Sequence, residues 1–156
     1  MQRQEPDRAE FLVPPPFIYL AAVVLGIVID LGFPLPVLPM PVALGLGAAL
    51  VAVAGALLGW TTRTMLAAGE HPDPDRPTSV IVTGGPYLFS RNPLYLALAI
   101  FATGVALLVN SGWGLALVAP ALIATHYWAI APEERYLDGK FVDGYRAYKS
   151  RVRRWI

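Results

Sequence analysis

Long apolar stretches alternate with polar connections along this chain. Four such stretches can be delimited, and they run roughly over Phe17–Phe33, Val42–Trp60, Leu94–Val109 and Trp113–Ala131. A helix needs about 20 apolar residues to cross the hydrocarbon core of a bilayer, because it rises about 1.5 Å per residue. The second stretch meets that length, and the third and fourth approach it with their flanking Tyr and Trp residues. The pattern therefore predicts an all-α integral membrane protein with about four transmembrane helices.

The composition supports this class. Hydrophobic residues make up 56% of the chain and charged residues only 15%, with a mean hydropathy of +0.53, which is more apolar than an ordinary soluble domain. The first stretch is too long for a signal-peptide core and lacks a small-residue cleavage site, so we expect it to be retained. The absence of cysteine excludes disulfides, thiolate catalysis and thiolate metal sites. A net charge of +1 argues against nucleic acid as a partner.

The basic residues are distributed asymmetrically. All 12 lie before the first stretch, between the second and third, or after the fourth, and the connections Pro34–Pro41 and Asn110–Gly112 carry none. With four spans, the three basic segments share one side of the bilayer, which the positive-inside rule makes the cytoplasmic side. We therefore expect both termini in the cytoplasm, in the inner membrane of a bacterium or archaeon.

The chain divides into three parts on this interpretation. Residues 1–16 form a cytoplasmic lead-in, residues 17–60 form two transmembrane helices, and residues 61–156 carry the candidate chemistry. This last part comprises a loop, a helical hairpin over 94–131 and a C-terminal helix. The connection between the hairpin helices is so short that they must run antiparallel. Pro120 is expected to kink the fourth helix.

Apolar side chains recur every three or four residues in the tail that follows Pro132. They are Leu137, Phe141, Tyr145, Tyr148, Val152 and Trp155. This spacing predicts an amphipathic helix at the cytoplasmic interface of the membrane. Docking on lipid would explain the stripe by itself, and a further role is an equal alternative.

Ionisable side chains mark the cytoplasmic ends of the hairpin. Arg91 precedes the third helix, and Glu133 and Glu134 end the fourth. We expect Arg91 to meet the glutamates there, because adjacent carboxylates at a membrane surface need a cation or donors to offset them. His126 lies two turns before Glu133 and nearly on the same face. The alternatives are that the glutamates are solvated interfacial charges and that His126 bonds a backbone carbonyl.

Several short motifs in this half of the chain occur in a recognisable order. They are Gly85-Pro86-Tyr87, Arg91-Asn92-Pro93-Leu94-Tyr95, Glu133-Glu134-Arg135-Tyr136-Leu137, Phe141 with Tyr145-Arg146-Ala147-Tyr148, and Val152 with Arg154-Trp155. Over about residues 60–156 the chain resembles the C-terminal region of the isoprenylcysteine carboxyl methyltransferase and phospholipid methyltransferase superfamily. The resemblance implies an S-adenosylmethionine-dependent membrane methyltransferase with a lipophilic or lipid-linked acceptor. The nearest named activity is carboxyl O-methylation of isoprenylcysteine.

The resemblance also implies roles for residues. It assigns cofactor binding to Gly85, Pro86, Tyr87, Arg91, Asn92, Tyr95, His126, Glu133, Glu134 and Tyr145, and it assigns the catalytic core to Arg91, Glu133 and Glu134. The guanidinium of Arg91 suits the carboxylate of the cofactor, and the glutamates suit its ammonium or its ribose hydroxyls. An amine or thiol acceptor would need a base, for which His126 and the glutamates are candidates. A metal site is not expected.

The chain departs from the superfamily pattern at Asn92, Ala97, Val142 and Arg153, where histidine, glycine, glycine and proline are common. Val142 affects the expected loop geometry of the tail, because valine adopts a left-handed backbone less readily than glycine. Three alternatives stay open: methylation of a phospholipid or small thiol, an NADPH-dependent membrane reductase of the sterol-reductase type, and a non-enzymatic scaffold whose basic tail binds anionic lipid. Asn92 and the intact E-E-x-x-L motif favour the methyl donor over the nicotinamide.

Overall fold

The computed structural model describes residues 13–73 and 77–156, and it is all-helical. Its elements are α1 (Pro15–Gly32), α2 (Met40–Ala67), the 3-10 turn η1 (Gly85–Leu88), α3 (Pro93–Leu108), α4 (Gly112–Thr125), the π-helical turn η2 (His126–Ile130), α5 (Ala131–Lys140) and α6 (Val142–Lys149). No strand occurs in the described ranges, which confirms the predicted fold class. Most of the lead-in, with Arg3 and Arg8, and also Arg76 lie outside them.

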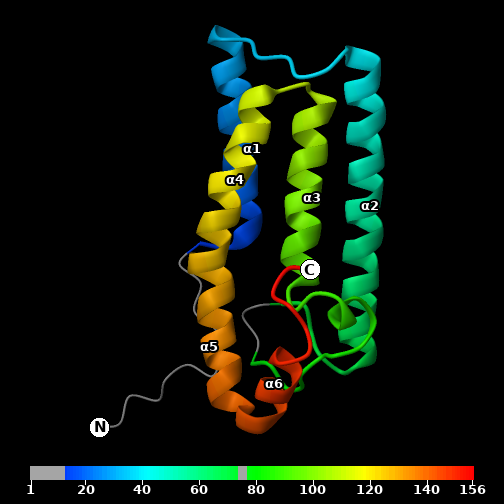
Figure 1. Cartoon of the computed structure of the whole chain (residues 1–156), viewed down its shortest axis with the longest axis vertical. Helices are drawn as coiled ribbons and strands as arrows, with labels where there is room; N and C mark the ends of the chain where they lie inside the picture. Colours follow the sequence, from blue (N-terminus) through cyan, green and yellow to red (C-terminus); the bar gives the residue numbers. More distant parts are fainter. Residues whose placement is uncertain (1–12, 74–76) are drawn as a thin grey trace, which may run out of the picture.

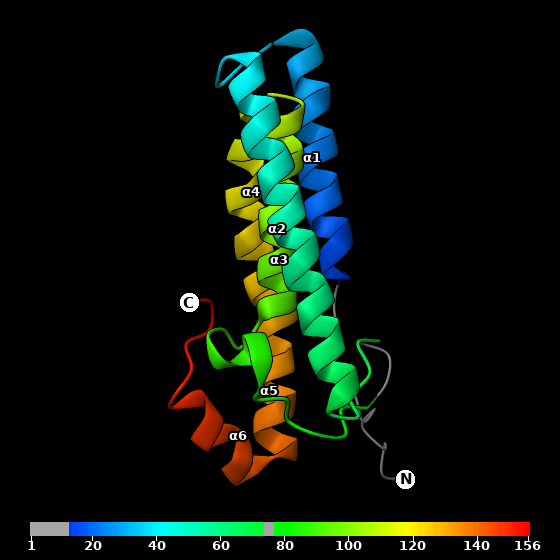
Figure 2. The same ribbon diagram turned by 90° about the vertical axis from the view of Figure 1, so that its right-hand side faces the viewer.

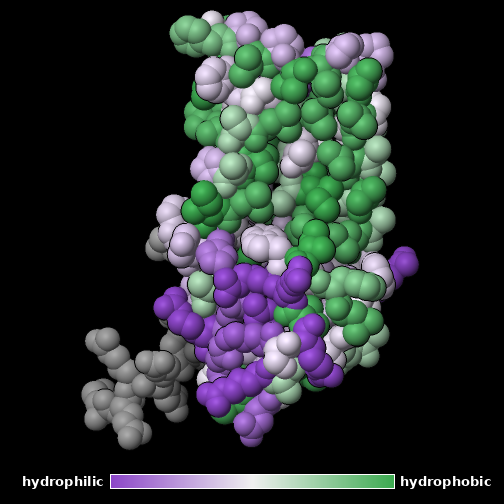
Figure 3. All heavy atoms as spheres, in the orientation of Figure 1, coloured by the Kyte–Doolittle hydropathy of each residue, from purple (hydrophilic) through white to green (hydrophobic). Residues whose placement is uncertain are grey.

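The helices stand side by side and form an elongated bundle (Figure 1). α1, α2 and the continuous unit Gly112–Lys140 are each long and apolar enough to cross a membrane, whereas α3 is a shorter apolar helix of 16 residues. Apolar surface covers the end of the bundle near the short connections, and hydrophilic surface gathers at the opposite end (Figure 3). The chain is an integral membrane protein.

Prolines and threonines set two of the helix boundaries. α1 begins at Pro15, so the last prolines of the expected lead-in form its first turn, where a proline N–H is not needed. α2 continues past Trp60 to Ala67. The hydroxyls of Thr61 and Thr64 donate to backbone carbonyls four residues earlier, at 2.8 Å each, which satisfies these polar groups within the helix.

Glycines allow two pairs of helices to approach closely. A Cβ on Gly26 of α1 would overlap the backbone of Gly114 in α4. A Cβ on Gly47 of α2 would lie 2.7 Å from the backbone nitrogen of Leu108 in α3. Small residues at such crossings bring backbones into van der Waals contact, and such packing contributes to helix association in lipid.

The two short connections lock together at the apolar end. Asn110, with φ of 52°, donates through its side-chain amide to the carbonyl of Leu38 at 2.8 Å and accepts from the backbone nitrogen of Val37 at 3.1 Å. The indole of Trp113 donates to the carbonyl of Phe33 at 2.8 Å. The predicted antiparallel hairpin is confirmed, and these bonds fix it to the α1–α2 connection.

The fourth helix differs from its prediction. The helical unit does not end near Ala131 but runs on to Lys140. Within it, α4 continues through Pro120 to Thr125, and the π-helical turn η2 joins α4 to α5. In this turn the N–H of Ala131 donates to the carbonyl of His126, five residues earlier. Pro132 follows directly and has no N–H to give, so the irregularity lies where α-helical bonding would be lost in any case.

The tail is not one continuous amphipathic helix. α5 ends at Lys140, Phe141 adopts φ of −122° and ψ of 50°, and α6 begins at Val142. Residues 150–156 are non-helical. Val142 starts a right-handed helix, so a glycine is not required there. α6 and the segment after it fold back toward the start of α3 (Figure 2), because the apolar stripe packs against the bundle rather than along a flat surface.

Candidate functional site

A cavity of about 300 Å³ lies at the hydrophilic end of the bundle, within the size range of small-molecule sites. The end of α2, the loop before α3, the first turn of α3, and α5 and α6 all contribute to its wall. Of the predicted site residues, it is lined by Tyr87, Arg91, Asn92, Tyr95, Glu133 and Tyr145. The cavity therefore collects residues that are more than fifty positions apart in the sequence.

Arg91 supplies the cationic part of the wall. Its side chain is 9% exposed, and Nη1 lies 3.2 Å from Oε1 of Glu134. That contact is within ion-pair distance but is not aligned as a hydrogen bond, and Nε and Nη1 have no hydrogen-bond acceptor among the described residues. Buried donors without acceptors are costly, so this guanidinium is suited to an anionic oxygen placed in the cavity.

The two adjacent glutamates face different surroundings. Glu134 is buried, and its carboxylate accepts from Nε of Arg154 at 3.1 Å and from Nη2 at 2.5 Å. Glu133 borders the cavity and accepts from the hydroxyl of Tyr95 at 2.7 Å. Neighbouring positions on a helix point about 100° apart, which separates the two carboxylates. The predicted meeting with Arg91 is confirmed for Glu134.

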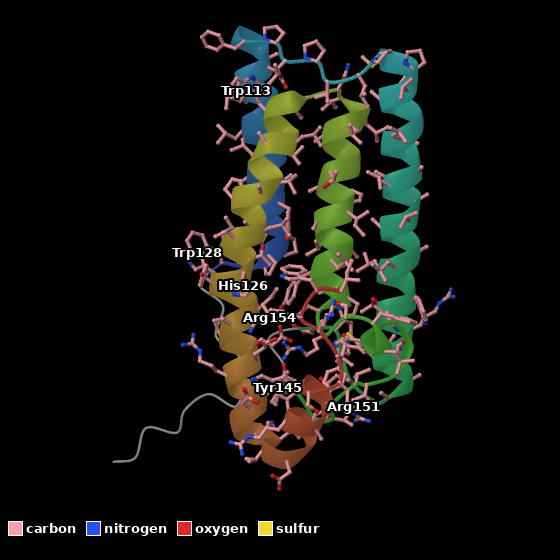
Figure 4. The ribbon with its side chains drawn as sticks, viewed as in Figure 1. Trp113, His126, Trp128, Tyr145, Arg151 and Arg154 are labelled. Carbon is pink, nitrogen blue, oxygen red and sulfur yellow. The ribbon has the colours of Figure 1, made fainter. Side chains whose placement is uncertain are left out.

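The π-helical turn changes the partner of His126. In a regular α-helix His126 would align with Glu133, but the wider turn takes up roughly one extra residue and brings Glu134 onto the side of His126 instead. Both side chains contact Arg154, whose Nη1 lies 3.3 Å from Nε2 of His126. His126 is not part of the cavity lining. Figure 4 shows His126 and Arg154 next to each other between α4 and the C-terminal segment.

The C-terminal segment is bonded to the residues that precede α3. The N–H of Arg91 donates to the carbonyl of Arg153 at 3.0 Å. The side chains of Asn92 and Ser90 donate to the carbonyl of Arg154 at 3.0 and 3.3 Å. Asn92 therefore holds the tail as well as bordering the cavity, and the position of Arg91 depends on the tail.

The Gly85-Pro86 pair supports the cavity wall without being part of it. Gly85 has φ of 58°, and a Cβ there would lie 2.6 Å from Oγ1 of Thr64 on α2. Neither residue of the pair lines the cavity, but the turn they form presents Tyr87 to it. The hydroxyl of Tyr148 donates to the carbonyl of Tyr87 at 2.7 Å. Burial raises the pKa of Tyr148 to about 12, so its phenol stays neutral and can donate.

Sequence reasoning missed two residues of this region. Glu70, 7% exposed, borders the cavity, and its Oε2 accepts from the N–H and hydroxyl of Ser79 and from the N–H of Val80 at 2.8, 2.9 and 3.1 Å. A carboxylate after a long apolar helix was the available signal. Arg154 stood in a recognised motif, but its pairing with Glu134 requires the turn between α5 and α6. The hydrogen bond with Glu134 raises the pKa of Arg154, which keeps the guanidinium charged.

Residues 42–143 match the family model described as "Phospholipid methyltransferase". The chain belongs to the phospholipid methyltransferase family. The matched range contains nearly all of α2, the loop, α3, α4 and the glutamate pair of α5, and membership makes the chain a membrane methyltransferase. Tyr145 and Arg154 lie beyond the matched range.

The other comparisons add one relative. The chain is 35% identical over 63 residues to an uncharacterized protein of Haemophilus influenzae, an alignment that covers 40% of this chain and 100% of that protein. No solved structure matches the chain.

Proposed function

We propose that this membrane methyltransferase uses S-adenosylmethionine and binds it in the cavity between Arg91 and Glu133. The observation that carries the proposal is a cationic wall with unused donors and an anionic wall in one cavity. The cofactor has matching parts, namely a carboxylate and an ammonium on the same carbon at one end, followed by a sulfonium and a ribose diol.

The residues present fit these groups. Arg91 can donate to the carboxylate through its planar fork, and Glu133 can accept from the ammonium or a ribose hydroxyl. Tyr87 and Tyr145 offer aromatic faces to the adenine. When bound, the cofactor supplies an electrophilic methyl group. The protein's part is to align donor and acceptor and to exclude water.

Glu134 has a different role in this proposal. Its carboxylate already binds Arg154 through two nitrogens and lies beside Arg91. A carboxylate held between two guanidinium groups has little capacity left for a ligand. Glu134 is therefore a positioning residue that sets the orientation of Arg91.

The charges around the cavity favour an amine over a carboxylate as the acceptor. The lining contains three acidic residues, Glu70, Asp73 and Glu133, and two basic ones, Arg91 and His71. A carboxylate acceptor would add a negative charge to this wall, whereas a protonated amine would be attracted to it. Glu133 can take the proton that the amine must lose. We therefore propose a lipid amine as acceptor and keep the isoprenylcysteine carboxylate as the second candidate.

A transfer assay tests this assignment. Purified protein in vesicles receives methyl-labelled cofactor with either phosphatidylethanolamine or S-farnesylcysteine. We expect label in the amine lipid, a strong loss with Glu133→Gln, and near-normal transfer with the exposed neighbour changed in Arg135→Gln. Label in S-farnesylcysteine alone would move the assignment to the carboxylate. Saturable binding of NADPH with no binding of S-adenosylhomocysteine would move it to a reductase.

A further inference from the structure

A second hollow lies on the outer face of the bundle between α3 and α4. It is an apolar groove of about 560 Å³, whose lining includes Leu96, Ala99, Leu122, Ile123, His126 and Trp155. It shares no lining residue with the cavity. The ion pair of Arg154 and Glu134 connects the two regions, since Arg154 contacts His126 and Glu134 contacts Arg91.

The groove lies at the boundary between the apolar and the hydrophilic surface. On the face seen in Figure 3, apolar side chains of the bundle give way to hydrophilic ones near the C-terminal segment. The side chain of Arg154 is 35% exposed at this level. After Asp143 the chain carries no acidic residue but does carry Arg146, Lys149, Arg151, Arg153 and Arg154.

We propose that this groove binds an anionic glycerophospholipid. One acyl chain lies between α3 and α4, and the phosphate lies near Arg153 and Arg154, which directly precede Trp155. The apolar walls match a hydrocarbon chain, and the positive tail matches an anionic headgroup, whose attraction to basic residues is strong close to a membrane surface. Trp155 is at the depth where amphipathic rings are favoured.

The bound lipid supports the site through the tail. Arg153 and Arg154 accept bonds from Arg91, Asn92 and Ser90 through their carbonyls. A lipid that contacts Trp155 and Arg154 therefore favours the tail position that orders Arg91. This consequence rests on the proposed function, whereas binding of the lipid does not.

Quenching of tryptophan fluorescence tests the binding without any cofactor. One variant keeps Trp155 and carries Trp60→Phe, Trp113→Phe and Trp128→Phe. The matched control keeps Trp128, which points outward from the bundle on the side away from α3 (Figure 4), and replaces Trp155 by Phe instead. Each variant is placed in vesicles of phosphatidylcholine and phosphatidylglycerol. In one series an increasing fraction of the phosphatidylglycerol has brominated chains, and in the other an increasing fraction of the phosphatidylcholine does, with the total charge of the vesicles held constant. Helical circular dichroism confirms folding.

We expect Trp155 to be quenched at a lower mole fraction of brominated phosphatidylglycerol than of brominated phosphatidylcholine, and Trp128 to follow the bulk fraction of either. Arg153→Gln should reduce the preference by up to about fivefold, whereas Arg63→Gln on α2 and Arg151→Gln, whose side chain lies toward the end of α2 and away from the groove (Figure 4), should not. Equal quenching by both lipids, or no quenching of Trp155, would overturn the proposal. If the substituted chains do not fold, native mass spectrometry of the unchanged protein decides, because it should retain phosphatidylglycerol in preference to phosphatidylcholine.

Discussion

Replacing Glu134 by glutamine tests whether this residue holds the site or contacts the ligand. Glu134 is 5% exposed and lies between Arg91, 9% exposed, and Arg154, 35% exposed. Removing one partner of a buried ion pair costs about 3–5 kcal/mol, because the remaining charge stays buried without compensation. The exposure of Arg154 and the oxygen that glutamine retains place this case near the lower end, at about 3 kcal/mol.

The assay combines two measurements on the same preparation. Denaturant unfolding in detergent should show that Glu134→Gln lowers the free energy of unfolding by about 3 kcal/mol. S-adenosylhomocysteine should also bind more weakly, because Arg91 loses its support. The matched variant Glu133→Gln should weaken ligand binding with little loss of stability, since its carboxylate faces the cavity. If Glu134→Gln removed binding and left stability unchanged, Glu134 would be a ligand contact rather than a residue that positions Arg91.

Three further predictions concern the tail, the loop and the helix crossings. Arg154→Lys should weaken S-adenosylhomocysteine binding by about tenfold in calorimetry, because an ammonium cannot reproduce the two parallel bonds to Glu134. Unchanged affinity would show that the tail does not order the site. Gly85→Ala should cost about 1–3 kcal/mol in unfolding experiments, since it combines a positive φ with a contact of 2.6 Å, and Gly84→Ala, with open space around it, should be tolerated. Gly26→Leu should prevent close packing of α1 on α4 and lower the thermal stability, whereas Gly45→Leu, with nothing near its Cβ, should not. Equal thermal stability of these two variants would contradict the close packing of α1 on α4.

Hydropathy predicted the bundle because membrane-spanning helices are specified by local composition. The apolar stretches, the short hairpin connection and the clustering of charge at one end all follow from residues close in sequence. The end of the fourth helix could not be found in this way. Its continuation past Ala131 depends on a π-helical turn before Pro132, and hydropathy does not encode hydrogen-bond registry.

Part of the candidate site was predicted as residues that lie near one another, but the different surroundings of these residues were not. Arg91, Tyr95 and Glu133 were expected near one another, and they line one cavity. The adjacent Glu133 and Glu134 read alike in the sequence, and only the tertiary position of Arg154 distinguishes them. The tail stripe was recognised, but the break at its centre arises from packing against the bundle rather than from periodicity.

A calorimetric titration of S-adenosylhomocysteine into the purified protein, with Arg91→Gln measured beside it, shows whether the cavity binds the cofactor through Arg91. We expect saturable binding to one site in the unchanged protein and an affinity at least about 100-fold lower in the variant, consistent with loss of a charge-assisted bidentate contact. Absence of binding to the unchanged protein, or equal affinity in both, would contradict binding of the cofactor through Arg91.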